Sequence, residues 1–360
     1  MRVGLALPHY DYSVPSGDTP SPGPGERPLG FATVVAHAER AEALGIDSLW
    51  VSDHLSLEIE KYGAGPGTYF AYEPLTTLAA LARRVHRPRL GTLVLCEALR
   101  PAGVLAKALA TLDHLCDGRL DIGIGAGWHP PDYEALGMAM PSPGERLARL
   151  AEAIDVLDGL LPGGPFSSEG RFHRVREALN RPPARQVPRP PVFVGGKGDR
   201  LLALVARRAD GWNTCWVWTP EAYRERASAL ERACIAAGRD PATVTRSLGL
   251  YALAGEDRRD LERRYERMRR LAPGGMLDTV SLDEWKVGRL VGTVSEVAEQ
   301  AAGWRALGVT ELILGAGPLP FSVTALDDLE PLAAALGLES SPQAERPEPA
   351  KAAGRPRQVP

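Results

Sequence analysis

The chain has 360 residues, 44% of them hydrophobic and 24% charged, and these proportions are typical of a soluble globular protein with one large core or two smaller ones. Lysine and arginine number 42 against 45 aspartates and glutamates, so the net charge of -3 argues against binding to nucleic acid or to an anionic membrane through overall charge. Four cysteines are scattered without a C-x-x-C pair or a histidine at zinc-like spacing, which predicts reduced thiols and no metal site.

The N-terminal apolar run is interrupted by Pro8, which is too early for a signal peptide, and no later run approaches the length of a membrane span. We therefore expect a cytoplasmic protein.

Short apolar runs recur along the chain with helical stretches between them, which is the rhythm of βα units in a parallel sheet. Eight strands are expected, and eight is the number in a closed (β/α)8 TIM barrel, the α/β fold that we predict. A doubly wound open sheet is the alternative, but its glycine signature would follow the first strand, where this chain has Leu7-Pro8-His9. The expected strands are Arg2 to Leu7, Ser48 to Ser52, Leu90 to Leu95, Leu120 to Gly125, Val192 to Gly195, Gly211 to Asn213, Leu248 to Ala254 and Glu311 to Leu314.

Two helices of this pattern end in the same way. Phe31 to Leu44 and Glu296 to Leu307 each carry one apolar face, and each is followed by a glycine suited to a helix C-cap, Gly45 and Gly308.

Residues 1–338 are predicted to form one domain with two irregular insertions. Residues 12–30, rich in Pro, Gly and Ser, form either a mobile lid or a floppy insertion. Residues 162–190 form the second insertion, with a small hairpin expected at Phe166 to Phe172. Residues 339–360 have no periodicity and are predicted to be a disordered tail.

In such a barrel, functional groups come from the C-terminal ends of the strands. Asp53 and His54 follow the second strand, where a histidine suits proton transfer or hydrogen bonding to a polar ring, although a helix cap with a merely polar neighbour is the alternative. Glu97 follows the third strand and is a candidate acid or base, but a surface ion pair with Arg100 is the more frequent role for such a residue. His9, after the first strand, is a lone candidate.

Two glycine-rich loops also follow strands. Gly123, Gly125 and Gly127 precede Trp128, a combination that suits a flat heterocycle held against backbone, with a tight turn as the alternative. The second loop, Gly195 to Gly198, brackets Lys197 just before a helix that begins near residue 199. There, free N–H groups and one ammonium could bind a phosphate.

The chain resembles the bacterial luciferase-like flavin oxidoreductase superfamily, in the branch that uses the deazaflavin coenzyme F420. The resemblance runs from Arg2 to about Leu338. Its motifs are Leu-Trp-Val-Ser-Asp-His at 49–54, Leu-Ala-Lys-Ala-Leu-Ala-Thr-Leu-Asp-His-Leu at 105–115, Gly-Arg-Leu-Asp-Ile-Gly-Ile-Gly-Ala-Gly-Trp at 118–128, Pro-Pro-Val-Phe-Val-Gly-Gly at 190–196 and Ala-Asp-Gly-Trp-Asn at 209–213.

This resemblance implies a TIM barrel, commonly a homodimer, with F420 or FMN at the C-terminal mouth. It implies that Asp53 and His54 lie beside the cofactor ring, with His54 as the catalytic or ring-orienting group. In the hydride-transfer hypothesis, Glu97 is a candidate second proton carrier. It also implies a non-prolyl cis peptide near the end of the third strand, behind the ring. The cofactor contacts that it implies are Thr92, Leu93, Val94, Gly125, Ala126, Gly127, Trp128, Val194, Gly195, Gly196 and Lys197, the last four at the phosphate tail.

One departure is informative. Sugar-phosphate dehydrogenases of this superfamily have a glutamate where this chain has Trp128, which argues against sugar-phosphate oxidation.

The leading hypothesis is hydride transfer between F420 and an unidentified small substrate. The alternatives are an FMN-dependent monooxygenase supplied by a separate reductase and a non-catalytic flavin-binding protein. An apolar or aromatic substrate would fit a mouth lined by aromatic side chains, for which the candidates are His9, Trp50 or its neighbours, Trp128, Trp216 and Trp218.

Overall fold

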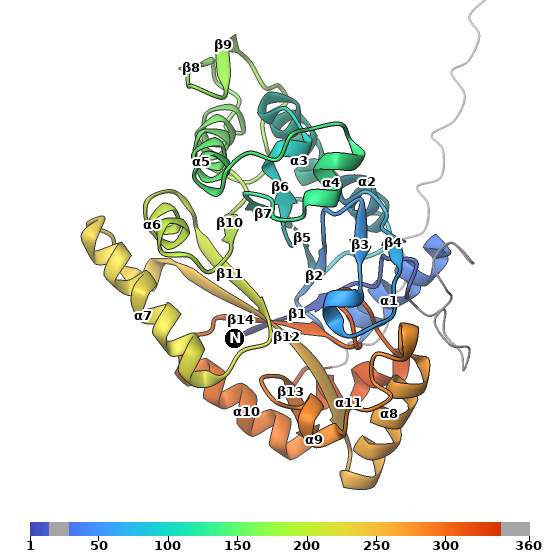
Figure 1. Ribbon diagram of the computed structural model, residues 1–360. Coiled ribbons are helices and arrows are strands. Elements are labelled where there is room, and N and C mark those ends of the chain that lie inside the picture. Colours follow the sequence, from blue (N-terminus) through green and yellow to red (C-terminus); the bar gives the residue numbers. More distant parts are fainter. Residues whose placement is uncertain (14–28, 340–360) are drawn as a thin grey trace, which may run out of the picture.

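The computed structural model describes residues 1–13 and 29–339, and its centre is a closed barrel of parallel strands (Figure 1). Neighbouring strands pair in the order β1-β2-β5-β7-β10-β11-β12-β14, and the pairing of β14 with β1 closes the barrel. The predicted TIM barrel is confirmed. The eight barrel strands are β1 (Arg2–Ala6), β2 (Ser48–Val51), β5 (Arg89–Thr92), β7 (Leu120–Gly125), β10 (Val192–Gly195), β11 (Gly211–Trp216), β12 (Thr245–Gly255) and β14 (Glu311–Gly315).

Helices surround the barrel, as Figure 1 shows. The two predicted glycine turns are confirmed, because Gly45 and Gly308 follow α1 and α10 with φ of 79° and 86°, a region in which glycine has no steric penalty. The helices are α1 (Phe31–Ala43), α2 (Pro74–Leu81), α3 (Ala102–Leu115), α4 (Pro130–Ala135), α5 (Pro143–Leu160), α6 (Asp199–Arg208), α7 (Pro220–Ala236), α8 (Arg258–Leu271), α9 (Leu282–Trp285), α10 (Val294–Ala306) and α11 (Leu329–Ala335), with single 3₁₀ turns at Glu60–Tyr62, Glu97–Leu99, Pro241–Thr243, Pro273–Gly275 and Leu326–Asp328.

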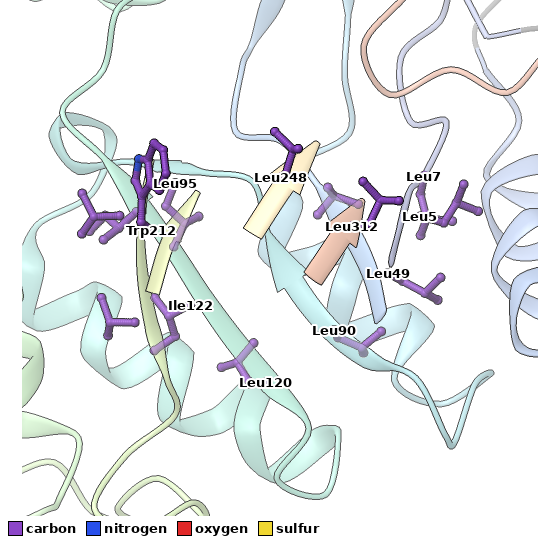
Figure 2. Close-up of a cluster of buried hydrophobic side chains, with 14 of the residues drawn as sticks. Leu5, Leu7, Leu49, Leu90, Leu95, Leu120, Ile122, Trp212, Leu248 and Leu312 are labelled. Carbon is purple, nitrogen blue, oxygen red and sulfur yellow. The ribbon is translucent and has the colours of Figure 1, made fainter. Parts of the chain in front are cut away.

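Alternate residues of the strands belong to two separate apolar clusters, as the two faces of a strand require. One cluster lies between the strands and the helices, and Figure 2 shows part of it. The other fills the barrel and extends to its mouth. Adjacent residues that divide in this way are Leu5 and Ala6, Leu49 and Trp50, Val192 and Phe193, and Leu312 and Ile313, the first of each pair facing the helices.

Trp50 fills the inside of the barrel instead of its mouth, so its expected place among the mouth residues is wrong. Its ring lies edge-on to Phe193 at 5.9 Å. Space for both rings comes from glycines, because a Cβ at Gly91 would lie 2.4 Å from the Trp50 ring and one at Gly211 would lie 2.3 Å from the Phe193 ring. The side chains of Trp50 and Phe193 therefore fill the inside of the barrel below its C-terminal mouth.

An ionic network of buried carboxylates and partly exposed arginines lies at the other end of the barrel, where the strands begin. Arg89 donates two hydrogen bonds to Asp121 at 2.7 and 2.8 Å, and Arg2 lies 3.1 Å from Glu311. Ser48 also donates to Glu311, at 2.8 Å. Burial raises the pKa of Glu311 to about 7 despite the attraction of Arg2.

Smaller strands lie outside the barrel. The sequence did not predict the antiparallel pair β3 (Ser56–Glu58) and β4 (Thr68–Phe70), nor β13 (Leu290–Thr293), which pairs with the end of β12. Two-residue β6 (Leu95–Cys96) pairs with the end of β7. The hairpin expected in the second insertion is confirmed as β8 (Phe166–Glu169) and β9 (Arg174–Ala178), although it reaches further along the chain than expected.

Most of the first insertion and nearly all of the predicted tail lie outside the described residues. Within the described ranges, none of the helices combines the length and apolar character needed to cross a membrane.

Candidate functional site

A cavity of about 700 Å³ lies at the C-terminal end of the barrel strands. It has the size of a small-molecule or cofactor site. Most of the predicted site residues line it, but Glu97, Thr92 and Val194 do not. The predicted residues that line it are Asp53, His54, Leu93, Val94, Gly125, Ala126, Gly127, Trp128, Gly195, Gly196 and Lys197.

His54 is held in the cavity wall by a carboxylate that the sequence did not reveal. Its Nδ1 atom lies 2.8 Å from Oδ2 of Asp132, in α4. The other oxygen of Asp132 accepts the backbone N–H of Leu55 at 3.0 Å, so the loop after β2 is tied to α4 at two adjacent residues. Because an ionised carboxylate can only accept, Nδ1 of His54 carries the proton and Nε2 is left for a ligand.

Asp53 also touches the cavity, but its carboxylate is already engaged. Arg100 donates to both of its oxygens, at 2.6 and 2.9 Å, and the backbone N–H of Cys96 donates at 2.9 Å. Arg100 also pairs with Glu73 at 2.6 Å. Asp53 therefore holds the loops after β2 and β5 together, and the expected pairing of Arg100 with Glu97 is wrong.

Glu97 is buried behind the cavity wall. Its two oxygens lie 2.8 Å from Nε2 of His173 and 3.4 Å from Nε of Arg149. His173 was assigned no role from the sequence, and here it connects the β8–β9 hairpin to the loop after β5. With both oxygens occupied and no contact with the cavity, Glu97 is placed to stabilise the insertion and not to exchange protons with a ligand.

The wall after β5 contains the non-prolyl cis peptide that the resemblance implied, between Leu93 and Val94. Glycines surround this bulge. A Cβ at Gly125 would lie 2.8 Å from a methyl of Val94, and one at Gly195 would lie 3.0 Å from the other. The glycines that the sequence suggested would admit a ligand directly therefore make room for Val94, which in turn lines the cavity.

Thr92 lies behind this wall. Its hydroxyl donates to the carbonyl of Gly123 at 2.8 Å and accepts the N–H of the same glycine at 3.0 Å. These reciprocal hydrogen bonds fix the end of β5 against β7. Val194 also misses the cavity, because it faces the helices from the opposite side of β10.

Cations and free backbone donors gather after β7 and β10. Lys197 lines the cavity immediately before the N-terminus of α6, which begins at residue 199 as predicted. Arg146, in α5, also lines it; one of its Nη atoms donates to the carbonyl of Pro141 at 2.7 Å, and its buried Nε has no partner among the described residues. A helix N-terminus with two cations favours an anionic group.

Aromatic side chains line the cavity on the side of β1, β11 and β14. Phe321 lies edge-on to Trp216 at 5.4 Å and 6.3 Å from Tyr10. The hydroxyl of Tyr10 is already bonded to Ser52 at 2.7 Å. Burial raises the pKa of the Tyr10 phenol well above its usual range.

Two more of the five expected mouth residues, His9 and Trp218, are buried and do not line the cavity. Nε2 of His9 accepts the backbone N–H of Ser52 at 3.2 Å, so Nδ1 carries the proton and donates to the carbonyl of Leu7 at 3.0 Å. Burial lowers the pKa of His9 to about 4, so this side chain is a neutral structural element. Trp218 is buried against Tyr223, with the ring centroids 6.0 Å apart.

Trp128 lies at the edge of the cavity with 52% of its surface exposed. Its ring is perpendicular to that of His54 at 5.2 Å, and the ammonium of Lys61 lies 3.6 Å from its centroid. A large exposed aromatic ring beside a cavity is suited to cover a bound planar molecule.

Sequence reasoning missed several lining or supporting residues, among them Tyr10, Phe321, Asp132, Arg146 and Asn213. Asp132 and Arg146 lie in helices, where a lone acid or base reads as a surface residue. Asn213 lines the cavity and donates to Ser247 at 2.9 Å. Its position at the end of a barrel strand was a usable signal. Among the described residues, no group of three or more histidines, cysteines or acids is arranged to hold a metal ion.

Comparison with known proteins finds a family and several relatives. The profile of the family described as luciferase-like monooxygenase matches residues 10–311. F420-dependent glucose-6-phosphate dehydrogenase of Microbacterium testaceum is 34% identical over 202 residues, 55% of this chain and 57% of that protein. F420-dependent hydroxymycolic acid dehydrogenase of Mycobacterium tuberculosis is 33% identical over 258 residues, 68% of each chain. The match to the glucose-6-phosphate dehydrogenases spans little more than half of their length.

Solved structures share the fold. An F420-dependent secondary alcohol dehydrogenase superposes with a TM-score of 0.71 at 17% identity, covering 92% of this chain and 96% of that one. Monooxygenase RslO1 from Streptomyces bottropensis gives the same TM-score at 24% identity, covering 93% and 98%. At these identities the likeness supports the barrel and not a particular reaction.

Proposed function

Because the chain belongs to the luciferase-like monooxygenase family, we propose that it is an oxidoreductase that transfers a hydride between coenzyme F420 and a small organic substrate. The relatives named for F420 support this choice of cofactor. The observation that carries the proposal is the cavity beside the Val94 bulge, with a histidine on one wall and cations beyond the bulge.

The residues present fit such a cofactor. Val94 offers an apolar surface to a flat ring, and Gly125 and Gly195 behind it have no Cβ that would displace its methyl groups. The unpartnered Nε of Arg146, the ammonium of Lys197 and the N-terminus of α6 suit the anionic tail. Bound F420 gives or takes a hydride at a ring carbon, and the protein supplies the orientation and the proton transfers.

His54 is the group that we assign to proton transfer. Asp132 holds its Nδ1–H at 2.8 Å, so Nε2 is the atom available to a substrate oxygen, and the same carboxylate stabilises the ring when it becomes protonated. Asp132 is thus a positioning residue. Asp53 acts indirectly, by holding the loop that carries His54, and Glu97 has no part in this proposal.

The test is to titrate the purified protein with F420 and with FMN separately and to follow binding by calorimetry. The proposal predicts saturable one-site binding of F420 that is at least tenfold tighter than binding of FMN. Tight FMN binding without F420 binding would instead support the flavin monooxygenase alternative, which uses the same end of the barrel.

A further inference from the structure

The indole of Trp128 is contacted by an ammonium group from outside the cavity. Trp128 lines the cavity and Lys61 does not, yet Nζ of Lys61 lies 3.6 Å from the centroid of the indole. A cation within about 6 Å of an aromatic centroid is attracted to the negative face of the ring. One face of Trp128 is therefore occupied by this ammonium.

The ammonium of Lys61 has no competing partner in direct contact. Among the described residues it forms no ion pair or hydrogen bond, and the other ring near it is that of Tyr62, at 5.0 Å. Burial raises the pKa of the Tyr62 phenol, so this side chain is uncharged at neutral pH. The indole of Trp128 is therefore the principal partner of this ammonium in the described part of the chain.

The hairpin that carries the lysine is packed into the core, whereas Trp128 is not. Leu57 and Ile59, in and after β3, are buried in the apolar cluster that fills the barrel and extends to its mouth. The N–H of Gly65 donates to the carbonyl of Gly274 at 3.3 Å, which ties the end of the hairpin to the turn after α8. Trp128 is more than half exposed, and its indole N–H has no partner among the described residues. The lysine is thus the fixed member of the contact, and the indole is the movable one.

Apart from the ammonium, the indole contacts two imidazole rings. Its centroid lies 5.2 Å from that of His54, with the rings nearly perpendicular, and 5.1 Å from that of His129. Burial lowers the pKa of His129, so this imidazole is uncharged at neutral pH. Because proton transfer is assigned above to His54, the orientation of Trp128 determines how the mouth is covered beside that residue.

Lys61 carries its charge at neutral pH but not far above it. Partial burial lowers the pKa of its ammonium to about 8, and the carboxylates of Glu58 and Asp132 oppose this change. Other titratable groups that face the contact are the phenol and the two imidazoles described above. The lysine is therefore a cation below about pH 8 and becomes neutral as the pH rises above that value, where its attraction to the indole is lost.

We propose that Lys61 is a positioning residue, whose ammonium holds the indole of Trp128 across the His54 side of the mouth and so slows the release of the bound cofactor. Lys61 itself touches neither the cofactor nor the reacting atoms. The effect on F420 rests on the function proposed above, whereas the hold on the indole does not.

The first experiment uses the protein without cofactor. The protein is labelled with 5-fluorotryptophan, and the fluorine resonance of Trp128 is identified by its loss in Trp128→Phe. We expect this resonance to move between pH 7 and pH 9 with a midpoint near pH 8. In Lys61→Met, which keeps the length of the side chain and removes the charge, it should not move. In Lys61→Arg, which stays charged throughout, it should keep its low-pH position at pH 9.

The second experiment measures the release of F420 by stopped-flow fluorescence at pH 7. Release should be about fivefold faster in Lys61→Met than in the original protein, and close to the original rate in Lys61→Arg. Lys286→Met is the matched control, because that lysine is paired with Asp283 and does not line the cavity. It should change neither the fluorine resonance nor the rate. Lys61 is exposed, so its variants should fold.

Three results would overturn the inference. They are a Trp128 resonance that Lys61→Met leaves unchanged, a Lys61→Arg variant that behaves like Lys61→Met, and F420 release at the same rate in Lys61→Met and the original protein. A protein that does not bind F420 would overturn the proposed function instead. The hold of Lys61 on Trp128 would then still be decided by the fluorine spectra, which need no cofactor.

Discussion

The imidazole of His54 and the carboxylate of Asp132 lie 2.8 Å apart, although 78 positions separate them in the sequence. One follows the second barrel strand and the other lies in α4, beyond the fourth. The carboxylate also accepts two backbone N–H groups, those of Leu55 and Ser56. It is buried, and its contact with Nδ1 leaves Nε2 as the nitrogen of His54 that is available to a ligand.

Asp132→Asn should reverse the tautomer of His54. The N–H groups of Leu55 and Ser56 require the amide oxygen on their side, which leaves the amide N–H₂ facing Nδ1 and forces the ring proton onto Nε2. We expect kcat to fall by about 10²-fold or more, within the range for loss of a proton-transfer group, with F420 affinity unchanged. Nitrogen NMR of the labelled ring measures the tautomer directly.

Asp155→Asn, which removes only a half-exposed ion pair with Arg208, is the control and should change neither quantity. If Asp132→Asn left the proton on Nδ1 and kcat at its original value, the positioning role of Asp132 would be wrong.

Gly125→Ala should damage the cavity wall. The added methyl would lie 2.8 Å from Val94, so the bulge must shift, and overpacking of this kind costs about 1–3 kcal/mol. Gly303→Ala, in α10, meets no atom within 4 Å and should raise stability by about 0.5–1 kcal/mol. Denaturant unfolding and F420 titration measure both effects. Unchanged stability and F420 affinity in Gly125→Ala would show that the glycine is not needed for the bulge.

Lys197→Met should weaken F420 binding about tenfold, because a charged hydrogen bond contributes about 1.5 kcal/mol or more. The loss should shrink as salt rises from about 0.1 M to about 1 M, where the screening length falls from about 10 Å to about 3 Å. Lys286→Met removes a half-exposed lysine paired with Asp283 and is the control. A salt-independent loss in Lys197→Met would point to packing and not to charge.

Glu311→Gln should change the pH dependence of stability. The pKa of Glu311 is raised from 4.5 to about 7, so its contribution to stability is complete below about pH 4.5 and is lost as the pH rises through 7. Relative to the original protein, the variant should gain about 2–3 kcal/mol between pH 5 and pH 8. Unfolding at both pH values measures this difference, with the exposed Glu225→Gln as the control. An equal effect of Glu311→Gln at the two pH values would contradict the raised pKa.

The barrel could be predicted because its signal is local. Each strand is a short apolar run next to a turn residue, and the runs recur with helices between them. Strands β3 and β4 were not predicted because each has only three residues and contains polar ones. Strand β13 was not predicted because its four residues lie in a stretch whose sequence pattern indicates a helix.

Of the candidate site, the sequence predicted only residues at or directly after the end of a barrel strand. The position of His54 identified it, but its partner Asp132 is held by tertiary structure that one sequence does not encode in any local pattern. For the same reason, Glu97 was placed at the mouth although His173 and Arg149 hold it elsewhere. The glycines before Trp128 were expected to let a ligand lie against the backbone. In the structure, groups of the same chain approach them: Thr92 at Gly123, Val94 at Gly125, and Tyr133 and Cys96 at Gly127.

A crystal structure of the protein with F420 tests the central claim most directly. We predict the deazaflavin ring against Val94 with His54 at the substrate side, and the phosphate of the tail within hydrogen-bonding distance of Lys197 or the first N–H groups of α6. A ring bound away from Val94 and His54, or a metal ion in this cavity, would contradict the account.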